Sequence, residues 1–260
     1  MIRGNPQFKQ QSLLSLLKVT ENNPQSVLSQ RTLEDNIMEN LVTIVGYDDS
    51  SFSRTSRVGT GLKLTTDGFI ITTHHNTQPY EEEWETMNVQ NQSSNEENDT
   101  SKKYVIIDKN GDSFSIDTSF WAFEPNLGIA LIKAMIPEKS VPIRFQPIRR
   151  NLVNREEIQL FGLRNQKPFN QLGKVTRESC SSMVSIEGGG LSINRDIFLT
   201  DAYGIPEFNG GIFTDFQGQF AGIGIYHPDE GRFGYMGGVK ANNVEDFIKK
   251  TAQDLYRLSL

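Results

Sequence analysis

The segment GTGLKLTTDGFIITTHH, residues 59–75, shows the pattern that decides the fold class. Two runs rich in β-branched and aromatic residues flank the turn sequence Thr66-Asp67-Gly68, which predicts a β-hairpin. The same texture continues outward in both directions. The predicted strands are, in chain order, Leu41–Val45, Gly61–Leu64, Phe69–Thr72, Tyr104–Ile107, Ser113–Ile116, Ile129–Ile132, Gln159–Phe161, Gly173–Thr176, Met183–Ile186, Ile197–Leu199, Gly211–Thr214, Gln219–Ile225 and Phe233–Met236.

These strands form two groups with no helical stretch between them. The first group predicts a barrel over about 41–140 and the second a barrel over about 155–240, with a crossover at 142–154 between them. We therefore expect an all-β fold of two barrels or sandwiches, within one domain that covers residues 32–250.

Helices are expected only at the two ends of this domain. Residues 1–31 are expected to form a helical N-terminal extension, with an amphipathic helix over 7–18, and Thr32 could cap a helix that runs to Leu41. A C-terminal amphipathic helix is expected over 242–258 behind Asn243, since apolar residues recur there at intervals of three and four.

The charge of the chain is concentrated in one window. Among 260 residues there are 32 acidic and 26 basic side chains, which give a net charge of −6. Residues 78–100 hold seven of the acidic side chains and no Lys or Arg, and we interpret them as a long polar insertion in the first barrel. The rest of the chain is nearly neutral, so a non-specific nucleic-acid binder is not expected.

Cysteine content and hydropathy limit the expected location. Cys180 is the only cysteine, which excludes an intrachain disulfide, and we interpret it as a small core residue. No apolar run approaches the roughly 18–20 residues of a membrane span. We expect a cytoplasmic protein; the alternative is an organelle matrix or stroma, because the acid-poor, Leu-containing N-terminus weakly resembles a transit peptide.

Three segments together resemble trypsin-like peptidases of the HtrA/Deg type. They are residues 59–75, EPNLGIALIK at 124–133 and TDAYGIPEFNGGIF at 200–213. They match, in order, the hairpin that ends in the catalytic His, the D-I-A-L-L strand, and the loop that carries the nucleophilic Ser. The resemblance covers roughly residues 35–250 and implies a two-barrel trypsin/chymotrypsin-like fold with a closing helix. The PDZ domain that is usual in the family is not expected here.

The resemblance also implies that the catalytic triad is degraded. His75 falls on the His position, Gly128 on the Asp position and Asn209 on the Ser position. In the family a Ser hydroxyl attacks the carbonyl, His accepts its proton, and Asp orients the imidazole. An Asn amide is a very poor nucleophile and Gly128 has no carboxylate. The resemblance therefore predicts a catalytically inactive serine protease homologue, a pseudoprotease.

The oxyanion loop departs from the family pattern as well. By the same resemblance this relic loop comprises Glu207, Gly210 and Gly211, and Glu207 stands where the family has a Gly. The competing hypothesis is an active serine endopeptidase with non-standard catalytic residues around His75. A metal site at His75 and His227 is not expected, because no Cys or carboxylate has metal-ligand spacing with them. We expect neither a metal nor another cofactor.

Binding could outlast the loss of catalysis. The strand that matches the family's substrate-pairing strand comprises Gly222, Ile223, Gly224, Ile225 and Tyr226, and an extended peptide could add to it as a further strand. The alternative is a closed cleft with binding on outer surfaces only. We expect a protein or extended-peptide partner, and the N-terminal extension is a candidate site for forming a homo- or hetero-oligomer.

Overall fold

The computed structural model describes residues 2–4, 30–46, 57–65, 67–77, 104–124, 126–135, 151–185, 192–229 and 232–258. The helix expected over 7–18, the acidic insertion 78–100 and most of the crossover 142–154 lie outside the described residues. No helix in the described ranges is long and apolar enough to span a membrane.

The first barrel consists of six antiparallel strands. They follow the order β6-β5-β2-β3-β4-β7, and pairing between β6 and β7 closes the ring. Their bounds are β2 Leu41–Gly46, β3 Arg57–Lys63, β4 Phe69–Thr73, β5 Tyr104–Ile107, β6 Ser113–Glu124 and β7 Ile129–Ala134. The predicted hairpin is the β3–β4 pair, in which Leu62 lies opposite Ile71.

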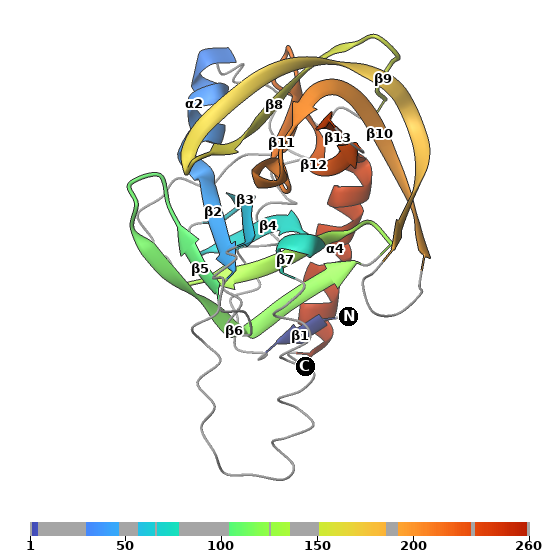
Figure 1. Cartoon of the computed structure of the whole chain (residues 1–260). Coiled ribbons are helices and arrows are strands. Elements are labelled where there is room, and N and C mark those ends of the chain that lie inside the picture. The colour runs from blue at the N-terminus through green and yellow to red at the C-terminus, as the bar shows by residue number, and fades with distance from the viewer. Residues whose placement is uncertain are drawn as a thin grey trace.

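The second barrel also closes with six strands, in the order β10-β13-β12-β11-β8-β9. Their bounds are β8 Glu157–Arg164, β9 Lys167–Ser185, β10 Ser192–Gly204, β11 Ile212–Asp215, β12 Phe220–Asp229 and β13 Arg232–Lys240. Figure 1 shows the two barrels one above the other, with β9 and β10 curving over the second. The prediction of an all-β fold of two barrels is confirmed.

Several strands are longer than the sequence predicts. The run Gly173–Thr176 and the described part of the run Met183–Ile186 belong to one strand, β9, which ends at Ser185. The run that begins at Ser113 continues as β6 to Glu124. Residues 176–179 of β9 are exposed, so this part of the strand has no need for the apolar residues that signal a strand.

Helices lie at the ends of the domain. Helix α2 spans Gln30–Asn40 and helix α4 spans Ala241–Leu258, which confirms both predicted helices and moves the start of α4 ahead of Asn243. Residues Ile2–Gly4 form a strand, β1, which pairs with Phe120–Ala122 of β6. The prediction of a wholly helical extension is therefore wrong at Ile2–Gly4, which form a strand. This strand, β1, contacts α4 (Figure 1).

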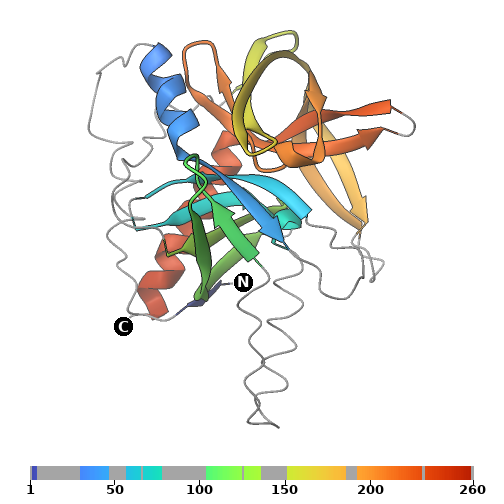
Figure 2. The same cartoon turned by 60° about the vertical axis from the view of Figure 1, so that its left-hand side comes forward.

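Among the residues that the structure describes, three apolar clusters make up the core. One fills the first barrel and one the second, while the third joins the two barrels to α2 and to the inner face of α4. Figure 2 shows α4 running behind the first barrel and up to the second. The ends of β4 and the loop before β11 meet at this junction, and they carry the residues that the sequence singles out.

Candidate functional site

The residue at the expected nucleophile position is part of a buried hydrogen-bond network. Asn209 is 7% exposed and follows a 3-10 turn, η3, over Pro206–Phe208. Its side-chain Oδ1 accepts a hydrogen bond from the backbone N–H of Tyr226 at 2.8 Å. Its carbonyl oxygen accepts one from the Thr60 N–H at 2.7 Å. Asn209 therefore connects η3 to β12 and to β3.

Asn76, which the sequence analysis did not single out, is the second centre of this network. It ends the 3-10 turn η1, His74–Asn76, and is 7% exposed. Its Nδ2 donates to Thr72 Oγ1 at 2.9 Å and to the carbonyl oxygen of Asn209 at 3.0 Å. A Cβ on Gly59 would overlap its carboxamide, so the G-T-G sequence leaves the space that Asn76 fills.

Thr60 completes the connection between the barrels. Its hydroxyl donates to the carbonyl oxygen of Glu207 at 2.6 Å and accepts from the Leu163 N–H at 3.1 Å. Its carbonyl oxygen accepts from Thr72 Oγ1 at 2.7 Å. Buried polar groups are stabilising only when they have partners. Here side chains of the first barrel donate to backbone carbonyl oxygens of the loop that holds Glu207 and Asn209 in the second.

The loop itself is folded into η3. The Asn209 N–H donates to the Pro206 carbonyl oxygen at 3.0 Å. An oxyanion hole requires the N–H groups of the nucleophile and of the residue two before it to point at the substrate. The first of these is bonded inside the loop, and Glu207 carries the second.

Gly210 and Gly211 allow the loop after η3 to pack closely against β3 and β8. Gly210 has φ 84°, and a Cβ there would overlap the carbonyl oxygen of Thr60. A glycine is therefore required by both conformation and space. The N–H of Gly211 donates to the Phe208 carbonyl oxygen at 2.9 Å.

Gly128, at the expected Asp position, has a backbone role. It ends a turn in which its N–H donates to the Glu124 carbonyl oxygen at 2.8 Å, and its φ is 69°. Its own carbonyl oxygen accepts from the His74 N–H at 2.8 Å. The turn thus lies beside η1. The left-handed conformation favours Gly and disfavours a residue with a side chain.

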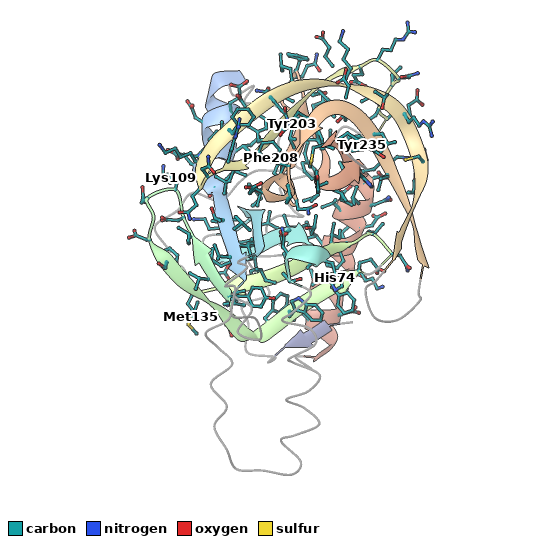
Figure 3. The ribbon with its side chains drawn as sticks, in the orientation of Figure 1. His74, Lys109, Met135, Tyr203, Phe208 and Tyr235 are labelled. Carbon is teal, nitrogen blue, oxygen red and sulfur yellow. The ribbon has the colours of Figure 1, made fainter. Side chains whose placement is uncertain are left out.

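The described histidine side chains belong to separate aromatic clusters. His74 is buried and stacks on Phe123, with ring centroids 4.8 Å apart. His227 stacks on Tyr235 of the second barrel at 5.3 Å. Figure 3 shows His74 and Tyr235 in different barrels. His75 lies in the middle of η1, and its side chain is outside the described set. Among the described residues no group of three or more His, Cys, Asp or Glu could hold a metal ion.

The strand proposed for peptide binding is already bonded on both sides. Residues Gly222–Tyr226 pair with β13 along one side. On the other side the Gly224 N–H donates to the Gly211 carbonyl oxygen at 2.6 Å, and the Gly224 carbonyl oxygen accepts from the Gly210 N–H at 2.9 Å. With the Tyr226 N–H on Asn209, a peptide strand could pair here only by replacing these bonds.

Cys180 is half-buried on β9 and packs against the core cluster between the barrels. Burial raises the pKa of its thiol. A raised pKa lowers the fraction of reactive thiolate at neutral pH, which fits the interpretation of Cys180 as a packing residue.

Solved structures with a similar fold include protease domains, one of them an HtrA-type protease. The MamO protease domain of Magnetospirillum magneticum, in its apo form, is 18% identical with a TM-score of 0.58, over 81% of this chain and 96% of that one. The chain has a trypsin-like, HtrA-type fold. The active form of the Rv3671c protease of M. tuberculosis is 14% identical with a TM-score of 0.61, over 88% of both chains. The HtrA-type protease AlgW with a tripeptide is 12% identical with a TM-score of 0.60, over 87% of this chain and 64% of that one.

Identities this low relate the folds and leave the chemistry to be argued from the residues. No protein-family model matches the sequence, and a search of curated proteins gives no match. The site is therefore judged from its own hydrogen bonds.

Proposed function

We propose that this chain is a trypsin-like protein without peptidase activity that serves as a protein-binding or assembly subunit. The observation that carries the proposal is the environment of Asn209. Its side-chain oxygen, carbonyl oxygen and N–H are all used in hydrogen bonds that hold the barrels and the loop together.

The chemistry of the position supports this proposal. An amide nitrogen is delocalised into its carbonyl and cannot replace a hydroxyl as the attacking group. Here the amide oxygen also accepts from Tyr226. The Asn209 N–H donates to Pro206, so a developing oxyanion would have to compete for that donor.

Gly128 removes the second requirement. A catalytic His needs a buried carboxylate to hold the correct tautomer and to stabilise the imidazolium; in the chymotrypsin example of this template, amide replacement of that Asp alone lowers turnover by about 10⁴. Gly128 brings only a backbone carbonyl, which the His74 N–H already occupies. Peptide hydrolysis by the family mechanism would therefore lack both its nucleophile and its orienting acid.

The proposed partner is a protein or an extended peptide. The acidic balance of the chain disfavours the phosphate contacts on which nucleic-acid binding depends. AlgW is an HtrA-type protease seen with a bound tripeptide, so the fold accommodates short peptides in that protein. In this chain a peptide has to displace internal bonds of β12 or bind elsewhere.

Activity-based labelling tests the proposal directly. Purified chain is incubated with a fluorophosphonate probe and, separately, with casein, alongside an active trypsin-like protease as a positive control. We expect no labelling and no cleavage beyond buffer. Stoichiometric labelling of one hydroxyl would overturn the proposal. Casein cleavage that is lost in His75→Ala would support the alternative, an active endopeptidase with non-standard residues around His75.

A further inference from the structure

Strands β9 and β10 continue beyond the second barrel as a two-stranded ribbon. β13 pairs with β10 only from Ile197 onward, and β8 pairs with β9 only up to Lys174. Farther out, residues 181–185 of β9 pair with 192–196 of β10, and no third strand in the described ranges pairs with them. We call these two segments the β-ribbon arm. Figure 1 and Figure 2 both show the two strands extending beyond the barrel.

The edge of β9 that faces away from β10 is uncovered along the arm. At the base of the arm, the chain just before β8 covers this edge. There the Arg155 N–H donates to the Val175 carbonyl oxygen at 2.7 Å, and the Asn154 N–H donates to the Glu178 carboxylate at 2.9 Å. Between 179 and 185 no described residue contributes a backbone bond to this edge. Such an edge presents backbone N–H and C=O groups that can pair with another strand.

The uncovered edge lacks the residues that usually prevent such pairing. Natural sheets protect exposed edges with charged side chains, lysine above all, and with proline. Residues 179–185 have the sequence SCSSMVS, which contains neither a charged residue nor a proline. The other strand of the arm has the sequence SINRD at 192–196, which contains two charged residues. Of the two edges of the arm, that of β9 is therefore the one suited to a further strand.

We propose that the β9 edge at 179–185 is a dimer interface and that its partner is the same edge of a second copy of this chain. An isolated two-stranded ribbon is marginally stable in water, whereas two paired arms form a sheet of four strands. Identical edges that pair antiparallel are related by a two-fold axis, so the contact closes as a dimer. The inference rests on the proposed function, because it names the partner of an assembly subunit.

The register of the dimer follows from the length of the uncovered edge. With the two-fold axis at Ser182, all residues from 179 to 185 pair, and Ser181 lies opposite Met183 of the second copy. No like charges meet along this register, because the segment has no charged residue. A shared edge of this length is small for a stable interface, so a dissociation constant in the micromolar range is expected.

Sedimentation velocity on a dilution series tests the interface through paired charges. The variant Ser181→Lys/Met183→Lys places lysine opposite lysine in the expected register, so its dissociation constant should be at least about tenfold higher than that of wild type. The variant Ser181→Glu/Met183→Glu should dimerise as weakly on its own. An equimolar mixture of the two variants should return to within about threefold of the wild-type dissociation constant, because opposite charges then face each other.

Recovery in the mixture would show that both variants fold and that the charges meet across the interface. Ser192→Lys/Asn194→Lys is the matched control, since it adds the same charges to the other strand of the arm. These lysines lie about 10 Å from the second copy, beyond the screening length of about 8 Å, so the dissociation constant should stay within about threefold of wild type. A wild type that is still monomeric at about 100 µM, or a Ser181→Lys/Met183→Lys variant that dimerises as tightly as wild type, would overturn the inference.

Disulfide trapping keeps the inference testable if the charged variants do not fold. In a Cys180→Ser background, which removes the only cysteine, Ser182→Cys lies on the two-fold axis and should form a disulfide-linked dimer when oxidised with copper phenanthroline. Ser185→Cys lies at the opposite end of the edge from its symmetry mate and should not. No trapping at Ser182→Cys, or equal trapping at both positions, would overturn the inference. Casein cleavage is measured on the same samples: a monomeric wild type defeats the inference alone, whereas cleavage defeats the proposed function.

Discussion

Replacing Asn76 with alanine is expected to weaken the joint between the two barrels. Asn76→Ala removes the donor group that bonds Thr72 Oγ1 at 2.9 Å and the carbonyl oxygen of Asn209 at 3.0 Å. The Asn209 carbonyl oxygen keeps its bond from the Thr60 N–H, so no buried acceptor is left wholly unpaired. The loss is therefore that of two ordinary hydrogen bonds, of a longer one to the Thr60 carbonyl oxygen at 3.4 Å, and of the buried carboxamide itself.

The magnitude follows from these losses. Two hydrogen bonds of this kind contribute about 0.5–1.5 kcal/mol each. The cavity left beside Gly59 adds about 1 kcal/mol to this loss of stability, for a cavity volume of roughly 40 Å³ and a cost of about 24 cal/mol per Å³. We expect Asn76→Ala to lower the free energy of unfolding by about 3 kcal/mol. An unfolding energy of about 5–15 kcal/mol is typical of a domain, so the effect is readily measured.

Asn76→Asp makes the test sharper, because it keeps the shape of the side chain and replaces the Nδ2 donor with a carboxylate oxygen, which accepts. A carboxylate there would face the carbonyl oxygens of Thr60 and Asn209, so at pH 7 it should lower the free energy of unfolding more than alanine does. Burial beside acceptors raises the pKa of the new carboxyl group above its unfolded value. The extra destabilisation is then absent below the unfolded pKa and grows as the pH rises through the folded pKa, so the variant should recover relative to Asn76→Ala in acid.

Urea unfolding followed by circular dichroism measures both variants. Asn110→Ala is the matched control, because Asn110 is exposed and its Nδ2 donates only to Asp108 at 3.3 Å. It should cost less than about 0.5 kcal/mol. A loss below about 1 kcal/mol for Asn76→Ala, or an aspartate variant as stable as the alanine variant at pH 7, would refute the role assigned to Asn76.

Three further predictions concern other positions. The double variant Gly128→Asp/Asn209→Ser should cleave casein no faster than wild type, because Gly128 has φ 69° and the N–H of Asn209 is bonded to the Pro206 carbonyl oxygen. Rapid cleavage would show that the oxyanion hole is intact. Gly210→Ala should lower the free energy of unfolding in urea by at least about 2 kcal/mol more than Gly111→Ala does. Both glycines have positive φ, but only a Cβ on Gly210 would overlap a carbonyl oxygen of β3, so equal losses would contradict this. Alkylation of Cys180 by iodoacetamide should follow a pH profile shifted to higher pH than that of a free thiol, because burial raises its pKa; an unshifted profile would argue against burial.

The sequence predicts the fold well because its local signals are strong. The turn at Thr66-Asp67-Gly68 and the apolar runs beside it mark the β3–β4 hairpin, and Gly68 has φ 91° as such a turn requires. Strand ends are predicted less well. Backbone pairing of β9 and β10 continues from Cys180 to Ser185 through residues without apolar periodicity.

The site is predicted in part. The family pattern selects Gly128 and Asn209, but Asn76 follows two histidines in a polar stretch and carries no signal of burial. Only the register of β3 and β4, with Gly59 above it, gives it a place in the network.

The core between the barrels has a consequence for synthesis on the ribosome. That cluster includes Ile37 near one end of the chain and Val244, Phe247, Ile248 and Leu255 of α4 near the other. At about 5–20 residues per second the first barrel emerges several seconds before α4 does. Its outer face, with Leu62, Phe69 and Ile71, then remains uncovered. Nascent chains are therefore expected to need a chaperone or an early partner on this face until α4 has been synthesised.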